Sequence, residues 1–89
     1  MRTITLDLER MTSVSALHKY LRSALALPAH YGANLDALYD CLTEIAELTQ
    51  IIVPADITDN EKLSWYGEQL LQVLQDAAEE NENLQVTVK

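Results

Sequence analysis

LALPAHYGANLDALYDCLT, residues 25–43, is the stretch from which the fold of this chain can be worked out. Pro28 and Gly32 interrupt its helical periodicity and predict a loop from Leu27 to Ala33, with a path that these two residues set. Asn34 is a residue type that caps helices, because its side chain accepts a hydrogen bond from a free backbone N–H. Apolar residues then recur every three or four positions, which predicts a helix from Leu35 to about Glu47.

The residues before this stretch predict a strand and a helix. Thr3 to Leu8 alternates polar and apolar residues, which is typical of a half-buried strand. After a turn over Glu9–Thr12, Ser13 or Ser15 can cap a helix. The apolar positions of this helix follow helical spacing: Val14, Leu17, Leu21 and Leu25.

The residues after the stretch predict two more helices. A short one is expected to start between Asp56 and Asp59 and to run to about Trp65. Gly67 is predicted to separate it from a longer helix, in which Leu70 and Leu74 are among the apolar positions. We expect Trp65 and Tyr66 in the core or at the helix junction, and residues 79–83 as a solvated helix end.

Two further strands complete the pattern. Thr49–Val53 is expected to be buried and to end at Pro54, and Leu84–Val88 alternates apolar and polar residues. Strands that are joined by helical crossovers run parallel to one another. We therefore predict an α/β fold, a three-stranded parallel sheet packed with about four helices, in a single domain over residues 1–89.

The composition indicates a compact globular protein. Hydrophobic residues make up 48% of the chain, too many for a disordered acidic tail. No stretch approaches the roughly 20 apolar residues that span a bilayer, and the first residues lack the apolar block of a signal peptide. Because Cys41 is the only cysteine, it cannot form an internal disulfide. We expect a cytoplasmic protein.

The charges are distributed unevenly along the chain. The formal net charge is −8, and from Ser23 to Glu61 there are seven acidic residues but no Lys or Arg. A long stretch of one sign attracts cationic partners and repels nucleic acid and anionic membranes. We therefore expect a basic protein as partner, with no direct contact to nucleic acid or membrane. From charge alone, a merely soluble acidic surface explains the pattern equally well.

The acidic residues gather on one face of the helix predicted after Asn34. At roughly 100° per residue, the apolar side chains share one arc and the polar ones the opposite arc, with Tyr39 on the border. Like charges at i and i+4 repel each other, so this face carries a local cost that suggests a function. The alternative is that Lys62 or Arg22 returns in space to pair with it. The polar arc consists of Asp36, Asp40, Thr43, Glu44 and Glu47.

The preceding loop places two aromatic side chains beside this face. His30 and Tyr31 can reach outward there, and aromatic residues next to charges are typical of interface hot spots. The pattern fits equally well a Tyr31 that packs on the first helix.

The same stretch resembles a known family. Leu25 to Pro28, Tyr31-Gly32 and Asn34 to Thr43 are similar to the loop and second helix of the barstar family, intracellular inhibitors of a secreted bacterial ribonuclease. A further local match lies at Leu71-Gln72-Val73, and the order of elements agrees from end to end. The resemblance implies a three-stranded parallel sheet covered by helices, and inhibition by a loop and helix that plug the active site of the ribonuclease.

The resemblance also implies which residues bind the partner. Asp40 matches the acid whose carboxylate takes the place of a substrate phosphate, and Asp36 matches a second acid of the interface. Asp76 stands where the family has a glutamate that faces the ribonuclease. Further matched interface positions are Tyr31, Gly32, Asn34, Leu35 and Thr43. The implied partner is a barnase-type ribonuclease or a related toxin, and no cofactor is implied.

The chain departs from the family pattern around these acids. His30 stands in place of a tyrosine, Tyr39 and Ile45 in place of tryptophans, and Glu44 in place of a glycine. The second cysteine of the family is absent. These changes bear on which ribonuclease is bound more than on how it is bound. Glu44 adds bulk and charge at the contact, which can exclude barnase itself.

Three other functions are weaker explanations of the same residues. An enzyme could use Cys41 with His30, but the helical projection places Cys41 at the core edge, about 100° from Asp40. A metal site could use His30, Asp36 and Asp40, but these supply one imidazole and no preorganised calcium loop. We therefore predict a binding protein, neither an enzyme nor a metalloprotein. An acidic interaction module for a basic partner that is not a nuclease is the remaining alternative.

Overall fold

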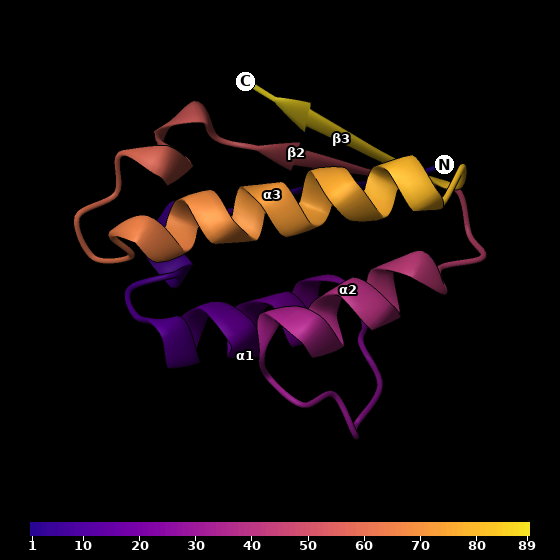
Figure 1. The fold of residues 1–89 in the computed structure, drawn as a ribbon, viewed down its shortest axis with the longest axis horizontal. Coiled ribbons are helices and arrows are strands. Elements are labelled where there is room, and N and C mark those ends of the chain that lie inside the picture. The colour runs from indigo at the N-terminus through magenta and orange to yellow at the C-terminus, as the bar shows by residue number, and fades with distance from the viewer.

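The computed structural model describes all 89 residues as one α/β unit (Figure 1). Its strands form a single parallel sheet in the order β1-β2-β3. The fold class predicted from the sequence is therefore confirmed. In chain order the elements are β1 (Arg2–Thr5), the 3-10 helix η1 (Leu8–Arg10), α1 (Val14–Ala24), α2 (Leu35–Thr43), β2 (Thr49–Val53), the 3-10 helix η2 (Ala55–Thr58), α3 (Trp65–Glu80) and β3 (Leu84–Val88).

The sheet has one buried face and one open face. In the buried face, Ile51 of β2 lies between Ile4 of β1 and Val86 of β3. The next residue along each strand belongs to the opposite face, where Thr5 is exposed and pairs with Ile52. This alternation follows from the two-residue period of a strand, so the buried face alone faces the core.

The helices bury the core against this face of the sheet. In Figure 1, α3 crosses in front of β2 and β3, and α2 lies below it. The helices α2 and α3 pack against each other, and each contributes fully buried leucines, Leu38 and Leu42 from α2 and Leu70 and Leu74 from α3. The core cluster contains 15 residues, to which α1, α2, α3, η2, β2 and β3 contribute, while Ile4 of β1 and Leu8 of η1 are partly buried against it.

The predicted fourth helix is absent, which corrects the expectation of about four helices. Only η2 forms after β2, and hydrogen-bonded turns lead from it to α3. The side-chain oxygen of Asn60 accepts hydrogen bonds from the backbone N–H groups of Lys62 and Leu63, which stabilises these turns in place of a helix. The expected first strand, Thr3 to Leu8, is also shorter, because η1 begins at Leu8.

Gly67 does not separate two helices but lies inside α3. A Cβ atom at this position would stand 2.0 Å from the backbone oxygen of Ile57 in η2. The glycine therefore allows close packing of η2 on α3, a role that a local sequence pattern does not reveal. Trp65 was expected in the core or at the helix junction; it is the first residue of α3 and 67% exposed, so it lies at the junction and not in the core.

Candidate partner-binding site

Helix α2 begins as expected, at an asparagine cap. The Asn34 side-chain oxygen accepts a hydrogen bond from the backbone N–H of Ala37 at 2.8 Å, and its amide group donates to the Gly32 carbonyl at 3.3 Å. The cap thus joins the helix to the loop before it. Leu35 is half-buried against the core behind this cap.

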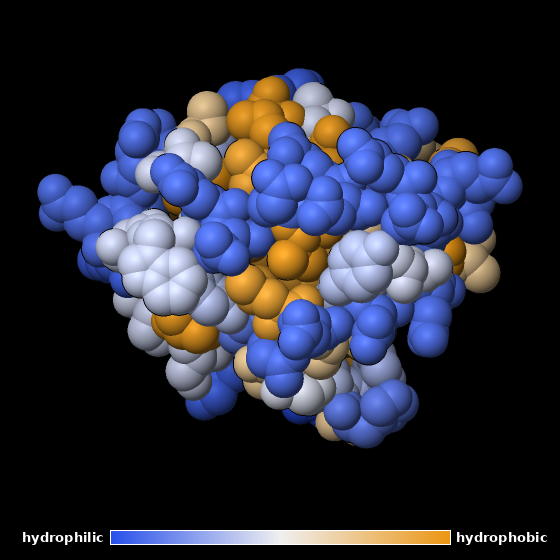
Figure 2. All heavy atoms as spheres, viewed as in Figure 1, coloured by the Kyte–Doolittle hydropathy of each residue, from blue (hydrophilic) through white to orange (hydrophobic).

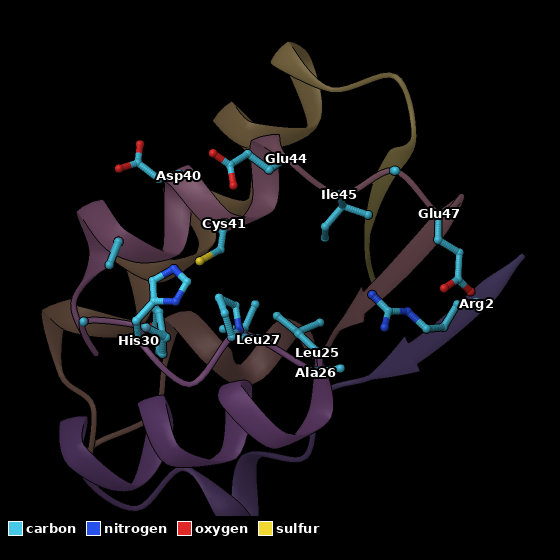
Figure 3. Close-up of a pocket in the computed structure, with 15 residues that line it drawn as sticks. Arg2, Leu25, Ala26, Leu27, His30, Asp40, Cys41, Glu44, Ile45 and Glu47 are labelled. Atoms are coloured by element: carbon cyan, nitrogen blue, oxygen red, sulfur yellow. The ribbon is translucent and has the colours of Figure 1, made fainter.

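The acidic face of α2 is open to solvent. Asp36, Asp40 and Glu44 are exposed, and Figure 3 shows Asp40 and Glu44 extending from the same side of the helix. Thr43 is half-buried, and its hydroxyl donates to the backbone carbonyl of Asp40 at 3.0 Å. The geometry of an outward acidic row, as deduced from the helical period, is therefore present.

The two bases that could have neutralised this row lie elsewhere. Arg22 of α1 lines a hollow together with Lys19, Tyr31 and Ala33. Lys62 is exposed in the turns before α3. Neither base is among the residues that line the hollow beside Asp40 and Glu44.

Helix α3 adds acidic residues near Tyr39, which is half-buried against the hydrophobic core. Partial burial, followed by the negative charges of Glu80, Asp76 and Asp40, raises the pKa of Tyr39. Asp76 is exposed and accepts a hydrogen bond from the side-chain amide of Gln72 at 2.8 Å. The structure thus brings Asp76 and Glu80 of α3 near the same tyrosine of α2 as Asp40.

Glu80 was not among the residues singled out from the sequence. It follows Asp76 by four residues, so both lie on the same side of α3. That spacing was visible in the sequence, but the packing of α3 against α2 was not. Figure 2 shows hydrophobic residues between the hydrophilic ones on this side of the molecule, so charged and apolar surface adjoin here.

A hollow of about 640 Å³ lies between α2 and the loop before it (Figure 3). Its walls include apolar side chains such as Leu27 and Ile45. Asp40, Glu44 and Glu47 are among the residues that line it, as is His30 of the loop. The structure therefore brings His30 and Asp40 to one hollow, which Asp36 and Asp76 do not line.

Arg2 closes one end of this hollow. In Figure 3 its side chain extends from β1 toward Ile45 and Leu25, and its Nε atom is buried without a hydrogen-bond partner. Arg2 pairs with Thr49 in the sheet, and this register brings β1 to the end of α2. No pattern in the sequence indicated that the N-terminal strand reaches the acidic helix.

Tyr31 points inward, contrary to one of the two expectations for it. Its hydroxyl is 2.5 Å from Nδ1 of His18 in α1, so the tyrosine packs on the first helix. His18 itself is only 2% exposed. Burial, with smaller contributions from Tyr66 and Cys41, raises the pKa of Tyr31, which therefore stays protonated at neutral pH.

Two alanines, and not Gly32, take the left-handed backbone conformation at this loop. Ala26 and Ala33, at its two ends, have positive φ angles of 53° and 54°, whereas Gly32 does not. A Cβ atom at Gly32 would lie 3.4 Å from the Cβ of Ala37, an ordinary contact. The left-handed backbone that usually selects glycine thus falls on two alanines, at a cost of about 1 kcal/mol each.

The C-terminal end of α2 is held by α3. The helix ends at Thr43 rather than near Glu47, and the buried side-chain amide of Asn81 donates to the carbonyls of Leu42 and Ile45, both at 2.9 Å. Each of these carbonyls also has a second donor, a backbone N–H for Leu42 and the Asn83 side-chain amide for Ile45. Asn81 therefore adds the hydrogen bonds that tie the end of α2 to the segment after α3. Residues 79–83 are therefore not simply a solvated helix end, because Asn81 is buried.

The residues proposed for two alternative functions, catalysis by Cys41 and metal binding, lack the chemistry that these functions require. Partial burial and the negative charges of Glu44 and Asp40 raise the pKa of the Cys41 thiol, which lowers its thiolate fraction and its nucleophilicity. His30, Asp36 and Asp40 do not form a group suited to hold a metal ion. None of the helices has the length and apolar character to cross a bilayer.

Comparison with known proteins agrees with this architecture. The fold and this surface define a class of small α/β proteins, which have a three-stranded parallel sheet and an exposed acidic helix after a short loop. A family model described as "Barstar (barnase inhibitor)" matches residues 1–89. A protein of Bacillus subtilis (strain 168), named "Putative ribonuclease inhibitor YrdF", is 38% identical over 81 residues, which cover 90% of this chain and 89% of that protein. The chain belongs to the barstar family.

Proposed function

We propose that this protein binds and inhibits a cationic ribonuclease of the barnase type by covering its active site with α2 and the loop before it. Membership of the barstar family supports this proposal, as does the name of the Bacillus relative. The observation that carries the mechanism is the solvent-exposed row of Asp36 and Asp40 on α2 and Glu44 at its C-cap. A ribonuclease binds RNA through basic groups, and such a row is complementary to them.

In this mechanism Asp40 occupies the position of a substrate phosphate, and Asp36 and Asp76 pair with basic groups at the edge of the cleft. The protein has no catalytic step of its own, and acts in the cytoplasm. Charge complementarity accelerates association and fixes the orientation of the two proteins. The proposed binding surface comprises His30, Tyr31, Gly32, Asn34, Leu35, Asp36, Tyr39, Asp40, Thr43, Glu44 and Asp76.

The substituted residues lie where they would influence the choice of partner. Glu44 and Ile45 both line the hollow beside Asp40, and His30 lies across it (Figure 3). A glycine at position 44 would leave this edge of the hollow without a charge. We propose that Glu44 favours a ribonuclease with an additional basic group opposite it.

The test is an inhibition assay with a purified barnase-type ribonuclease and a fluorogenic RNA substrate. The double variant Asp36→Ala/Asp40→Ala is compared with Glu79→Ala/Glu82→Ala, which removes the same number of exposed negative charges elsewhere. We expect the wild type to inhibit, the first variant to be weaker by at least about 100-fold, and the second to change little.

Two outcomes would contradict the proposal. If both double variants lose inhibition equally, net charge and not the α2 row determines binding. If the wild type leaves ribonucleases active but binds a basic protein that is not a nuclease, the protein is an interaction module of another kind.

A further inference from the structure

A buried histidine links three separate parts of the fold. His18 of α1 is 2% exposed, and its Nδ1 atom is 2.5 Å from the Tyr31 hydroxyl in the loop. Its Nε2 atom is 2.6 Å from the hydroxyl of Tyr66 in α3. The Tyr66 ring meets the imidazole edge to face, with ring centroids 5.8 Å apart and an interplanar angle of 82°. Both ring nitrogens are therefore occupied by tyrosines.

The two hydrogen bonds depend on each other. Burial lowers the pKa of His18, so the ring is neutral at pH 7. A neutral imidazole has one N–H donor and one acceptor nitrogen, so one tyrosine must accept while the other donates. Removal of either hydroxyl leaves a buried nitrogen of the His18 ring without a hydrogen-bond partner, so the ring is held less firmly in its position.

The loop has few other ties to the rest of the molecule. The Tyr31 backbone N–H donates to the Pro28 carbonyl, and Asn34 donates to the Gly32 carbonyl. These bonds join residues that lie within three positions of each other, whereas the bond to His18 spans 13 residues and reaches α1. The loop is therefore anchored through one side chain, that of Tyr31.

We propose that His18 and Tyr66 are positioning residues that hold Tyr31, and through it the loop of residues 28–33, in a fixed place beside the acidic face of α2. Tyr66 acts from α3 without belonging to the proposed binding surface. The value of this arrangement for inhibition rests on the proposed function. The positioning itself is a property of the free protein and can be measured without a partner.

The experiment is amide hydrogen exchange by NMR on the wild type, Tyr66→Phe and Tyr20→Phe. Tyr66→Phe keeps the ring and removes only the hydroxyl. Tyr20→Phe is the matched control, because its hydroxyl also makes two hydrogen bonds, to the N–H of Asp7 and the carbonyl of Thr5, but at a distance from the loop. The reporter is the Tyr31 amide, with the Thr49 amide of β2 as an internal reference for global unfolding.

We expect Tyr66→Phe to raise the exchange rate of the Tyr31 amide, relative to that of the Thr49 amide, by about five-fold. This is the size of effect expected for the loss of one hydrogen bond. Tyr20→Phe should leave this ratio unchanged. Equal acceleration at Tyr31 and Thr49 would show a general loss of stability and overturn the proposal, as would an unchanged Tyr31 amide. Variant His18→Gln should reproduce the local effect, and its failure to do so would also overturn the proposal.

A parallel inhibition assay separates this inference from the proposed function. If the wild type inhibits no ribonuclease, the proposed function fails, whereas the exchange ratio still decides whether His18 and Tyr66 position the loop.

Discussion

The side-chain amide nitrogen of Asn81 lies 2.9 Å from the backbone carbonyl oxygen of Leu42. The same amide group donates to the Ile45 carbonyl at 2.9 Å, and the Asn81 side-chain oxygen accepts from the N–H of Asn83. One side chain therefore fixes the end of α2 to the connection between α3 and β3. Because α2 carries the proposed binding face, its orientation depends on a residue 39 positions later in the chain.

Replacement of Asn81 should destabilise the protein. Asn81→Ala removes the two 2.9 Å hydrogen bonds and leaves these carbonyls with donors at 3.4 Å, so we expect the free energy of unfolding to fall by about 2 kcal/mol. Asn81→Asp should be at least as harmful, since a carboxylate cannot donate to a carbonyl. Urea denaturation followed by circular dichroism measures both variants, with the exposed neighbour change Glu82→Ala as control. Stability equal to that of the control would show that these hydrogen bonds contribute little.

An alanine at position 67 should also be destabilising, although alanine is the better helix former. The added Cβ would stand 2.0 Å from the Ile57 backbone oxygen, so η2 and α3 must move apart. We expect Gly67→Ala to lower the free energy of unfolding by about 1–3 kcal/mol, the usual cost of overpacking. Thermal unfolding of this variant can be compared with Gln69→Ala, an exposed site in the same helix. A stabilised Gly67→Ala protein would mean that the close contact is absent.

Stability should depend on the protonation of His18. Burial lowers the pKa of His18 in the folded state below its ordinary value of 6.5, so the unfolded chain takes up a proton first as the pH falls. The contribution is fully present above about pH 6.5 and is lost as the pH falls from there toward the folded-state value. Urea unfolding at pH 7.5, 6.5 and 5.5 measures this decline. His18→Gln should lack this part of the slope, and an identical pH profile for both proteins would refute the assignment to His18.

Association with a ribonuclease should slow as salt is added. The exposed carboxylates of Asp36 and Asp40 attract a cationic cleft over distances that salt screens. Between 50 and 500 mM NaCl we expect the association rate constant to fall by about ten-fold or more, as measured by stopped-flow fluorescence. The Asp36→Ala/Asp40→Ala variant should show a shallower dependence. A rate constant that does not respond to salt would argue against electrostatic steering.

Local patterns were sufficient for much of the fold. The cap at Asn34 and the helix after it follow from side-chain and backbone hydrogen bonds within four residues, so the sequence of that segment predicts them correctly. The outward acidic face follows from the helical period in the same way. The parallel sheet follows from the alternation of strands and helices along the chain.

The features that the sequence left undecided or predicted wrongly depend on contacts between distant segments. Tyr31 could point outward or pack on α1, and His18 decided this. Gly67 was predicted to be a break because its contact with Ile57 belongs to another element.

The sequence by itself therefore determined the fold class, the order of the strands and of the three α-helices, and the acidic face of α2, because each follows from neighbouring residues. Only the tertiary structure decided where α2 ends, how Tyr31 is held and that α3 adds its acids to that face. His18 and Tyr66 lie 48 residues apart, and such a pairing exists only once the helices have packed.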